Sequence, residues 1–279
     1  MLDRITVVTD ALDHPEGVAW SPSGAIYAGG EAGQVYRVSL NGDVSLVGTT
    51  EGFAFGLTLD ADDRAYVCDF ARAELVRVDP DGTASTITGG TPERPMQVPN
   101  YSAFGDDGTL YVTDSGPWGE ASGVIYSVAP DGTTEVWTDA VPDFPNGCCL
   151  TADGRGLLVV ESRARRVAHV AIGSDGASGS VTTVAMFDGS QPDGIALAVD
   201  GETFIVGCYR PDRLYLATLS GSVDVLADDP DGVVLNQPTN VAFVGDDLAT
   251  LAISSLGGWT ISTVDVGLAG LPLRRPSLS

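Results

Sequence analysis

The chain has 279 residues, of which 43% are hydrophobic and 19% charged, and its formal net charge at pH 7 is −24. So negative a chain is unsuited to binding nucleic acid or an anionic membrane surface, and we expect neither as a partner. The chain contains no run of about 18 apolar residues, so no membrane span is predicted. The N-terminus also lacks the basic and then apolar segments of a secretory signal, and we therefore expect a cytoplasmic protein. The four cysteines have no zinc-site spacing and are expected to be free thiols.

Short apolar strands alternate with turn residues along the whole chain. The first four expected strands are residues 18–20, 25–28, 34–38 and 44–47. The same order returns at residues 57–59, 65–67, 75–78 and 86–88. Further turn signals stand at residues 106–108, 131–132, 153–154, 174–176, 200–201, 220–221 and 245–247. No segment has a convincing helical period, so we expect an all-β protein.

A recurring phrase, a proline followed by a polar residue and a short apolar run, opens each expected group of strands. Its copies are Pro15-Glu16, Pro99-Asn100, Pro145-Asn146, Pro192-Asp193 and Pro238-Thr239, with a degenerate copy at Phe55. Successive copies are 39 to 47 residues apart. Repeats of about 40 to 50 residues with four strands each are typical of a β-propeller. We therefore predict a six-bladed β-propeller with four-stranded blades.

The last blade is one strand short, because only a stretch rich in Gly, Leu and Pro follows residues 259–266. The apolar segment Ile5–Thr9 at the N-terminus is expected to supply the missing strand, since joining the two chain ends in one blade closes the ring and hides a strand edge. We expect residues 1–267 to form this single domain. Residues 268–279 are expected to be a poorly ordered C-terminal tail on the surface.

In an up-and-down blade, the start of the innermost strand and the loop between the second and third strands lie on the same face. The innermost strands would therefore gather Glu16, Asn100, Asn146 and Asp193 around the central channel, and we call these four residues the oxygen ring. Carboxylate and amide oxygens suit Ca²⁺, Mg²⁺ or Mn²⁺, whereas two converging carboxylates without a cation would repel each other. The alternative is that these side chains bond to main-chain amides at the channel mouth and bind nothing.

Three of the phrases carry a resemblance to a known family: Pro15-Glu16-Gly17-Val18-Ala19-Trp20, Pro145-Asn146-Gly147 and Pro192-Asp193-Gly194. From about residue 12 to residue 266 the chain resembles the SMP-30/gluconolactonase/luciferin-regenerating-enzyme family of six-bladed propellers, whose members are commonly lactonases. The resemblance implies that Glu16, Asn146 and Asp193 bind one divalent cation, with Ca²⁺ favoured and Mg²⁺, Mn²⁺, Zn²⁺ or Fe²⁺ as alternatives. It also implies that Asn100 approaches the metal or the substrate. In the implied mechanism the metal polarises the lactone carbonyl and activates a water molecule, and Asp193 acts as general base.

One phrase departs from the family pattern. Sugar-lactone enzymes of the family typically carry Arg-x-Asn-Asp in the third blade, where this chain has Val98-Pro99-Asn100-Tyr101. Groups that would contact a polyhydroxylated substrate are thereby lost, so we expect a lactone or related ester less polar than a sugar lactone. The residues expected to contact it are Asn100, Tyr101, Phe55, Trp118 and Tyr209. The alternative for the aromatic residues is packing between blades.

Charged residues in and beside the loops of the same face have separate interpretations. Arginines there would favour a carboxylate-bearing substrate or, alternatively, pair with acids at the rim; they are Arg72, Arg163, Arg165, Arg210 and Arg213. Asp69, Asp114 and Glu161 close the second strands of three blades in register. We expect these three acids either to accept hydrogen bonds between blades or to support the metal ligands from behind, and not to bind the metal themselves.

Three functions are compatible with this sequence. The first is the metal-dependent hydrolase, most directly a lactonase. The second is a non-hydrolytic enzyme on the same fold, catalysing a cyclisation, condensation or isomerisation in secondary metabolism, because the fold alone does not determine the reaction. The third is a binding propeller without catalysis, which would not need the oxygen ring. The expected partner is a small molecule, and the protein is expected to be a monomer or a weak oligomer.

Overall fold

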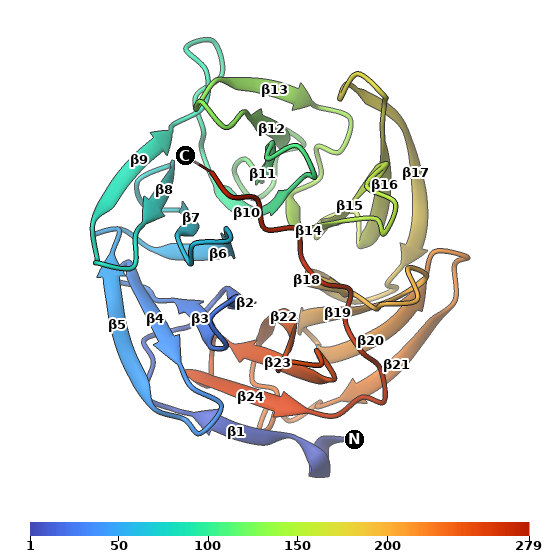
Figure 1. The fold of residues 1–279 in the computed structure, drawn as a ribbon. Coiled ribbons are helices and arrows are strands. Elements are labelled where there is room, and N and C mark those ends of the chain that lie inside the picture. Colours follow the sequence, from blue (N-terminus) through green and yellow to red (C-terminus); the bar gives the residue numbers. More distant parts are fainter. Residues whose placement is uncertain (279) are drawn as a thin grey trace.

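The computed structural model of the protein describes residues 1–278, which are folded almost entirely into β-strands. Six antiparallel sheets of four strands each are arranged around a central axis (Figure 1). In every sheet the strands follow one another in chain order from the axis outward, apart from the sheet that contains the N-terminal strand. The prediction of a six-bladed propeller is therefore confirmed.

The first three blades are each continuous in sequence. Blade 1 consists of β2 (Val18–Trp20), β3 (Ile26–Gly29), β4 (Gln34–Val38) and β5 (Val44–Thr49). Blade 2 consists of β6 (Ala54–Leu59), β7 (Ala65–Asp69), β8 (Glu74–Val78) and β9 (Ala84–Thr88). Blade 3 consists of β10 (Pro99–Phe104), β11 (Leu110–Asp114), β12 (Val124–Val128) and β13 (Thr134–Thr138).

Blades 4 and 5 repeat this arrangement with longer outer strands. Blade 4 consists of β14 (Pro145–Leu150), β15 (Gly156–Glu161), β16 (Arg166–Ile172) and β17 (Ser178–Met186). Blade 5 consists of β18 (Gln191–Leu197), β19 (Thr203–Arg210), β20 (Asp212–Thr218) and β21 (Val223–Asp228). Blade 6 consists of β22 (Pro238–Val244), β23 (Thr250–Ser255), β24 (Thr260–Val264) and the N-terminal β1 (Thr6–Thr9).

Blade 6 closes the propeller by joining the two ends of the ring. Strand β1 pairs antiparallel with β24, with Thr6 opposite Thr263, as predicted from the missing strand. A single turn of 3-10 helix, η1 (Leu2–Arg4), precedes β1. Within residues 1–278, no helix has the length and apolar character needed to cross a membrane.

Burial decreases from the axis outward. Every residue of the inner strands β14 and β22 is buried, whereas the outer strands β5 and β9 are largely half-buried or exposed. Apolar side chains of neighbouring sheets meet between the blades, as where Val18 and Ile26 of blade 1 pack with Ile261 of blade 6. Strands that are buried on both faces read as nearly continuous apolar runs, which is the pattern of the inner strands.

Strand register determines which segments share a face. Pro99 at the start of β10 lies opposite Asp114 at the end of β11, and Pro145 at the start of β14 lies opposite Glu161 at the end of β15. The starts of the inner strands and the loops between second and third strands therefore lie at one end of the channel. We call this end the loop face.

The C-terminal segment 268–278 crosses the other end of the channel (Figure 1), and we call it the strap. Hydrogen bonds join it to all six blades. Arg275 Nη2 donates to the Trp20 carbonyl of blade 1, and Ala61 N–H of blade 2 donates to the Pro276 carbonyl. Arg274 donates to the Asp106 carboxylate of blade 3 and to the Thr151 carbonyl of blade 4. Leu271 N–H donates to the Leu197 carbonyl of blade 5, and Gly270 N–H to the Leu248 carbonyl of blade 6. This placement differs from the expected poorly ordered tail; the division of the chain at residue 267 stays a prediction.

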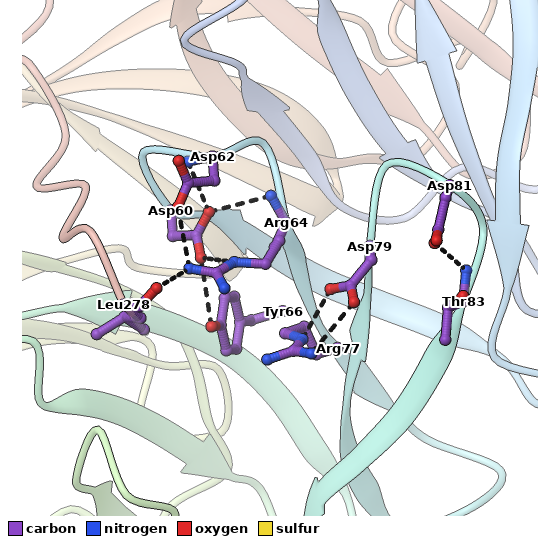
Figure 2. A network of polar contacts seen from close by, with 9 residues as sticks. All are labelled: Asp60, Asp62, Arg64, Tyr66, Arg77, Asp79, Asp81, Thr83 and Leu278. Carbon is purple, nitrogen blue, oxygen red and sulfur yellow. Dashed lines mark hydrogen bonds and ion pairs between the residues drawn. The ribbon is translucent and has the colours of Figure 1, made fainter.

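Arg64 fastens the end of the strap to blade 2 (Figure 2). Its guanidinium donates to the fully buried carboxylate of Asp60, with 2.6 Å between Nε and Oδ2, and to the carbonyl of Leu278. The same carboxylate accepts the main-chain N–H groups of Asp62 and Arg64, so the turn after β6 is held in a fixed shape. The strap thus docks on a rigid part of the blade.

Beneath the strap, the channel contains a cavity of about 70 Å³. Apolar side chains from the ends of the inner strands, including Leu150, Leu197 and Phe243, line it together with Leu271 of the strap. The oxygen ring does not line this cavity, which lies on the strap side of the channel.

Candidate metal and active site

The four side chains of the oxygen ring are all buried, with only 2–5% of each residue exposed. Each carries one buried oxygen without a hydrogen-bond partner among the described residues: Glu16 Oε2, Asn100 Oδ1, Asn146 Oδ1 and Asp193 Oδ1. Buried polar atoms in folded proteins almost always have a partner, so each such atom calls for an explanation. Four of them, one from each of four blades, make up the donor set that a hard cation binds.

Glycines bring the ring positions of neighbouring blades into contact. A glycine follows the ring position in four of the six phrases, and a side chain there would collide with the next blade. The distances from a Cβ built at the glycine to the neighbouring main-chain oxygen are 2.4 Å from Gly17 to Phe55, 2.5 Å from Gly56 to Asn100 and 2.7 Å from Gly147 to Asp193. Glycine is needed here because one main chain approaches another closely.

Hydroxyl groups complete the contacts between blades. Thr239 Oγ1 and Ser254 Oγ donate to the main-chain carbonyl of Glu16 at 2.8 and 2.7 Å, and Thr113 Oγ1 donates to that of Asn146 at 2.8 Å. These bonds hold the main chain at the ring positions in place. Thr239 occupies the ring position of blade 6, but its hydroxyl is already engaged with Glu16 and Ser254.

Burial disfavours the ionised form of both ring carboxylates. It raises the pKa of Asp193 to about 8, which the neighbouring amide of Asn146 partly opposes. Burial also raises the pKa of Glu16 well above its ordinary value, and the charge of Asp193 raises it further, so the two carboxylates lie close enough to repel each other. A cation between them would favour both ionised forms. The residues of the ring therefore fit a divalent cation.

Three acids brace the chain where it approaches the ring. Asp69, Asp114 and Glu161 accept the main-chain N–H groups of Phe53, Val98 and Asp143, at 3.1, 2.9 and 3.0 Å. Each bond joins the end of a second strand to the segment that leads into the inner strand of the same blade. The expectation that these acids connect neighbouring blades is therefore corrected: they act within one blade, because the inner and second strands of one blade meet at that point.

The predicted substrate contacts fall into two groups. Phe55 and Tyr209 lie near the ring, since the Phe55 main chain abuts Gly17 and the charge of Asp193 adds to the rise in the pKa of Tyr209 that burial causes. Trp118 is 51% exposed in the loop between β11 and β12 and packs edge-on against Phe144 at 4.7 Å between ring centroids. Tyr101 lines the cavity on the strap side, and its ring also lies against Gly56, the residue after Phe55. Burial raises the pKa of Tyr101, and the charge of Glu16 adds to that rise.

Two aromatic residues that the sequence analysis did not single out, Phe70 and Trp259, join this set. Phe70 stacks on Phe55 with 4.9 Å between centroids and an interplanar angle of 4°. Trp259 packs on His14 at 4.2 Å. Phe70 and Trp259 stand in loops between second and third strands, as Trp118 does, and that loop position is the signal by which they could have been found.

Two of the five arginines of the loop face are closely paired with acids. Arg72 Nη2 lies 2.7 Å from Glu74, and Arg213 Nε lies 2.7 Å from Asp228, as in the rim interpretation. Arg163 has only a loose contact of 3.8 Å with Asp143, and its Nη1 is buried without a hydrogen-bond partner in the described chain. Arg165 and Arg210 are exposed.

A second group of possible metal ligands lies at the rim of the loop face. His14 Nδ1 is 2.6 Å from Glu31 Oε2 and 3.3 Å from Asp13 Oδ1. These residues are half-buried or exposed, and their mutual hydrogen bonds account for their positions without an ion. Unlike the oxygen ring, this group leaves no buried oxygen unpaired.

Two family models match the sequence. The model described as "SMP-30/Gluconolactonase/LRE-like region" matches residues 92–257, and the model described as "Strictosidine synthase-like, N-terminal" matches residues 2–38. No curated protein is significantly similar to the chain in sequence.

Solved structures with the same fold include three at 16–21% sequence identity. A gluconolactonase from Xanthomonas campestris is 21% identical over 95% of this chain and 89% of its own, with a TM-score of 0.80. The luciferin-regenerating enzyme is 16% identical over 98% of this chain and 99% of its own, with a TM-score of 0.81. Regucalcin from Agrobacterium tumefaciens, described as a calcium-binding protein, is 16% identical over 98% of this chain and 97% of its own, with a TM-score of 0.79. At these identities the likeness shows the fold.

Proposed function

Because the chain belongs to the SMP-30/gluconolactonase/LRE-like family, we propose that it is a divalent-metal-dependent hydrolase that opens a lactone or related ester less polar than a sugar lactone. The observation that carries the proposal is the oxygen ring, with four buried oxygens that lack hydrogen-bond partners and two carboxylates that burial disfavours as anions. A protein gains nothing from burying such groups unless a ligand satisfies them.

Glu16, Asn146 and Asp193 would hold the cation, and Asn100 would contribute a further oxygen to the cation or orient the substrate. Three or four oxygen ligands with two formal negative charges suit Ca²⁺ first, and the description of regucalcin as calcium-binding supports that choice. A divalent cation bound there would supply Lewis-acid polarisation of the substrate carbonyl and a lowered pKa for water.

Asp193 would act as the general base. Its carboxylate belongs to the ring and has two oxygens, so Oδ1 would bind the cation while the other oxygen accepts the proton of an attacking water molecule. The Asn146 amide beside it opposes the rise in its pKa and thereby favours the ionised form that a base requires. Glu16, whose main chain is held by Thr239 and Ser254, would keep its charge at a fixed position and orient the cation.

The third blade supports a substrate of low polarity. Val98 and Tyr101 stand where sugar-lactone enzymes of the family carry an arginine and an aspartate. Tyr101 is buried with its ring against Gly56, so it offers an aromatic surface where the family has a carboxylate. A polyhydroxylated lactone would leave several hydroxyl groups without partners, which disfavours its binding.

A second candidate is a non-hydrolytic reaction, such as a cyclisation, condensation or isomerisation. The match of residues 2–38 to the N-terminal region of strictosidine-synthase-like proteins favours it, but those residues cover only β1 and blade 1 up to β4. The longer match at residues 92–257 covers the phrases of Asn100, Asn146 and Asp193. We therefore rank hydrolysis first.

The test combines metal analysis with an activity assay. Purified protein should contain about one divalent cation per chain, and Glu16→Gln should lose it, whereas the matched variant Glu31→Gln at the rim group should retain it. A panel of lactones followed by acid release should show hydrolysis by the wild type and a loss of about a hundredfold or more in Asp193→Ala. Metal that persists in Glu16→Gln, or metal-loaded protein that opens no lactone or ester, would contradict the proposal.

A further inference from the structure

Because the strap covers one end of the channel, a substrate would reach the oxygen ring from the loop face at the other end. Main-chain hydrogen bonds of 2.8 and 2.9 Å tie Leu271 and Gly270 to blades 5 and 6, and Arg274 reaches across to blades 3 and 4. Residues 271–275 form one wall of the cavity at that end of the channel. A substrate of the ring would therefore contact the side chains of the loop face.

Three aromatic pairs stand on that face beside three different ring positions. Each pair joins a residue at the start of an inner strand to a residue in a loop between second and third strands. The pairs are His14 with Trp259, Phe55 with Phe70, and Phe144 with Trp118. His14 and Phe144 each precede a ring residue by two positions, and Phe55 itself occupies the ring position of blade 2.

The loop members of these pairs are more exposed than packing requires. Phe70, Trp118 and Trp259 are exposed by 41, 51 and 45%, although their partners are half-buried. Exposed apolar side chains scattered singly need no explanation, but these three stand in equivalent loops of one face, each beside a ring position, and offer a binding surface. Their exposed ring faces offer stacking surface and no hydrogen-bond acceptor for a sugar hydroxyl.

The main chain beneath two of the pairs is held in an unfavourable conformation. His14 and Phe144 have φ values of 43° and 61°, in the left-handed region that residues with a side chain rarely adopt. Both residues precede a proline, which restricts the main chain further. Strain of this kind persists where the surrounding structure enforces it, and it is concentrated at binding and catalytic sites.

We propose that the three aromatic pairs form a subsite for a flat apolar group, and that the substrate is a lactone or ester carrying an aryl ring. The inference rests on the proposed hydrolase function, to which it adds the substrate class. The aryl ring would lie against the exposed faces of Phe70 and Trp118 while the carbonyl group reaches the oxygen ring. The aromatic pairs would replace the polar contacts that the third blade has lost.

Two lactones with the same six-membered ring test the subsite: dihydrocoumarin, which carries a fused benzene ring, and δ-valerolactone, which does not. The measured quantity is the ratio of their kcat/KM values in metal-loaded protein. Trp118→Ala and Phe70→Ala should each lower this ratio about tenfold, mainly through KM for dihydrocoumarin, and Trp118→Phe should restore most of it. The intrinsic reactivities of the two lactones cancel when variants are compared with the wild type.

Leu46→Ala is the matched control, because Leu46 is 61% exposed on the outer strand β5, and it should leave the ratio unchanged. Thermal unfolding of each variant shows whether the fold is retained. If the wild type opens both lactones and the ratio is the same in Trp118→Ala and Phe70→Ala, the aryl subsite is wrong while the hydrolase proposal stands. If the wild type opens neither these lactones nor any other ester, the proposed function fails and the subsite fails with it.

Discussion

At the scale of single residues, Asp193 and Glu16 couple the candidate site to the stability of the whole protein. Burial raises the pKa of both carboxyl groups in the folded state, that of Asp193 to about 8, whereas an unfolded aspartate titrates near pH 3.9. Between these values the folded protein binds more protons than the unfolded chain. The free energy of unfolding of the metal-free protein therefore decreases as the pH rises through this window.

This dependence gives a prediction for Asp193→Asn. Urea unfolding of metal-free protein at about pH 5 and about pH 8 should show a smaller loss of stability in Asp193→Asn than in the wild type, because one of the two groups no longer titrates. Adding Ca²⁺ should stabilise the wild type more at the higher pH, where fewer protons compete for the carboxylates. If the free energy of unfolding changed equally with pH in the two proteins, titration of Asp193 would not be the cause of the pH dependence.

At the scale of elements, three of the six blades are each held together at the loop face by an acid that links the first two strands of the blade. Asp114, at the end of β11, accepts the N–H groups of Gln97 and Val98 before β10 and that of Gly116 after β11, at 2.7, 2.9 and 3.1 Å. The residue is 3% exposed, so these donors would lose their partner without gaining water. The brace thus determines where Asn100, two residues beyond Val98, enters the ring.

Replacing this brace should destabilise the protein strongly. Asp114→Ala leaves three main-chain donors without an acceptor, and we expect the free energy of unfolding to fall by about 3 kcal/mol. Asp131→Ala is the control, since Asp131 accepts a single N–H from Thr133 in an exposed turn, and its effect should be much smaller. Chemical denaturation of both variants measures the difference, and similar losses in the two would contradict a bracing role for Asp114.

At the scale of the whole molecule, two devices close the propeller. The pairing of β1 with β24 joins the first and last strands of the ring, and the strap ties the turns of all six blades across the face opposite the site. Blades in a propeller contact only their neighbours, so a segment that spans all six resists the opening of any one interface. The strap also forms one wall of the apolar cavity in the channel.

Removing residues 268–279 should therefore lower the free energy of unfolding by roughly 3 to 6 kcal/mol, from the lost burial of Leu271 and the lost main-chain hydrogen bonds. Cys149, which is 8% exposed and lines the cavity, should react faster with a thiol reagent in the truncated protein. Ser277→Ala is the control, because this strap residue is exposed and does not line the cavity, and its replacement should change stability by less than about 0.5 kcal/mol. Unchanged stability and unchanged thiol reactivity after truncation would show that the strap contributes nothing.

The blade count, the closure by the N-terminal strand and the equivalent positions of the oxygen-ring residues were predictable from the sequence, because a propeller repeats one local pattern. Each proline-led phrase opens an inner strand, so Glu16, Asn100, Asn146 and Asp193 occupy equivalent positions whatever the rest of the chain does. The glycine after the ring position was also present in the sequence. That it is required for contact with the next blade is seen only in three dimensions.

The tertiary structure alone decided the features that depend on contacts between remote segments. In sequence the strap is a segment rich in Gly, Leu and Pro. Its docking could not be predicted from this composition, because its hydrogen-bond partners are main-chain groups of distant turns. Tyr101 neighbours Asn100 in sequence, but only the three-dimensional structure shows that its ring packs on Gly56 of blade 2 beside the cavity. The aromatic pairs arise because loops of different blades converge on one face, and periodicity along the chain encodes which loops share a face but not which side chains meet there.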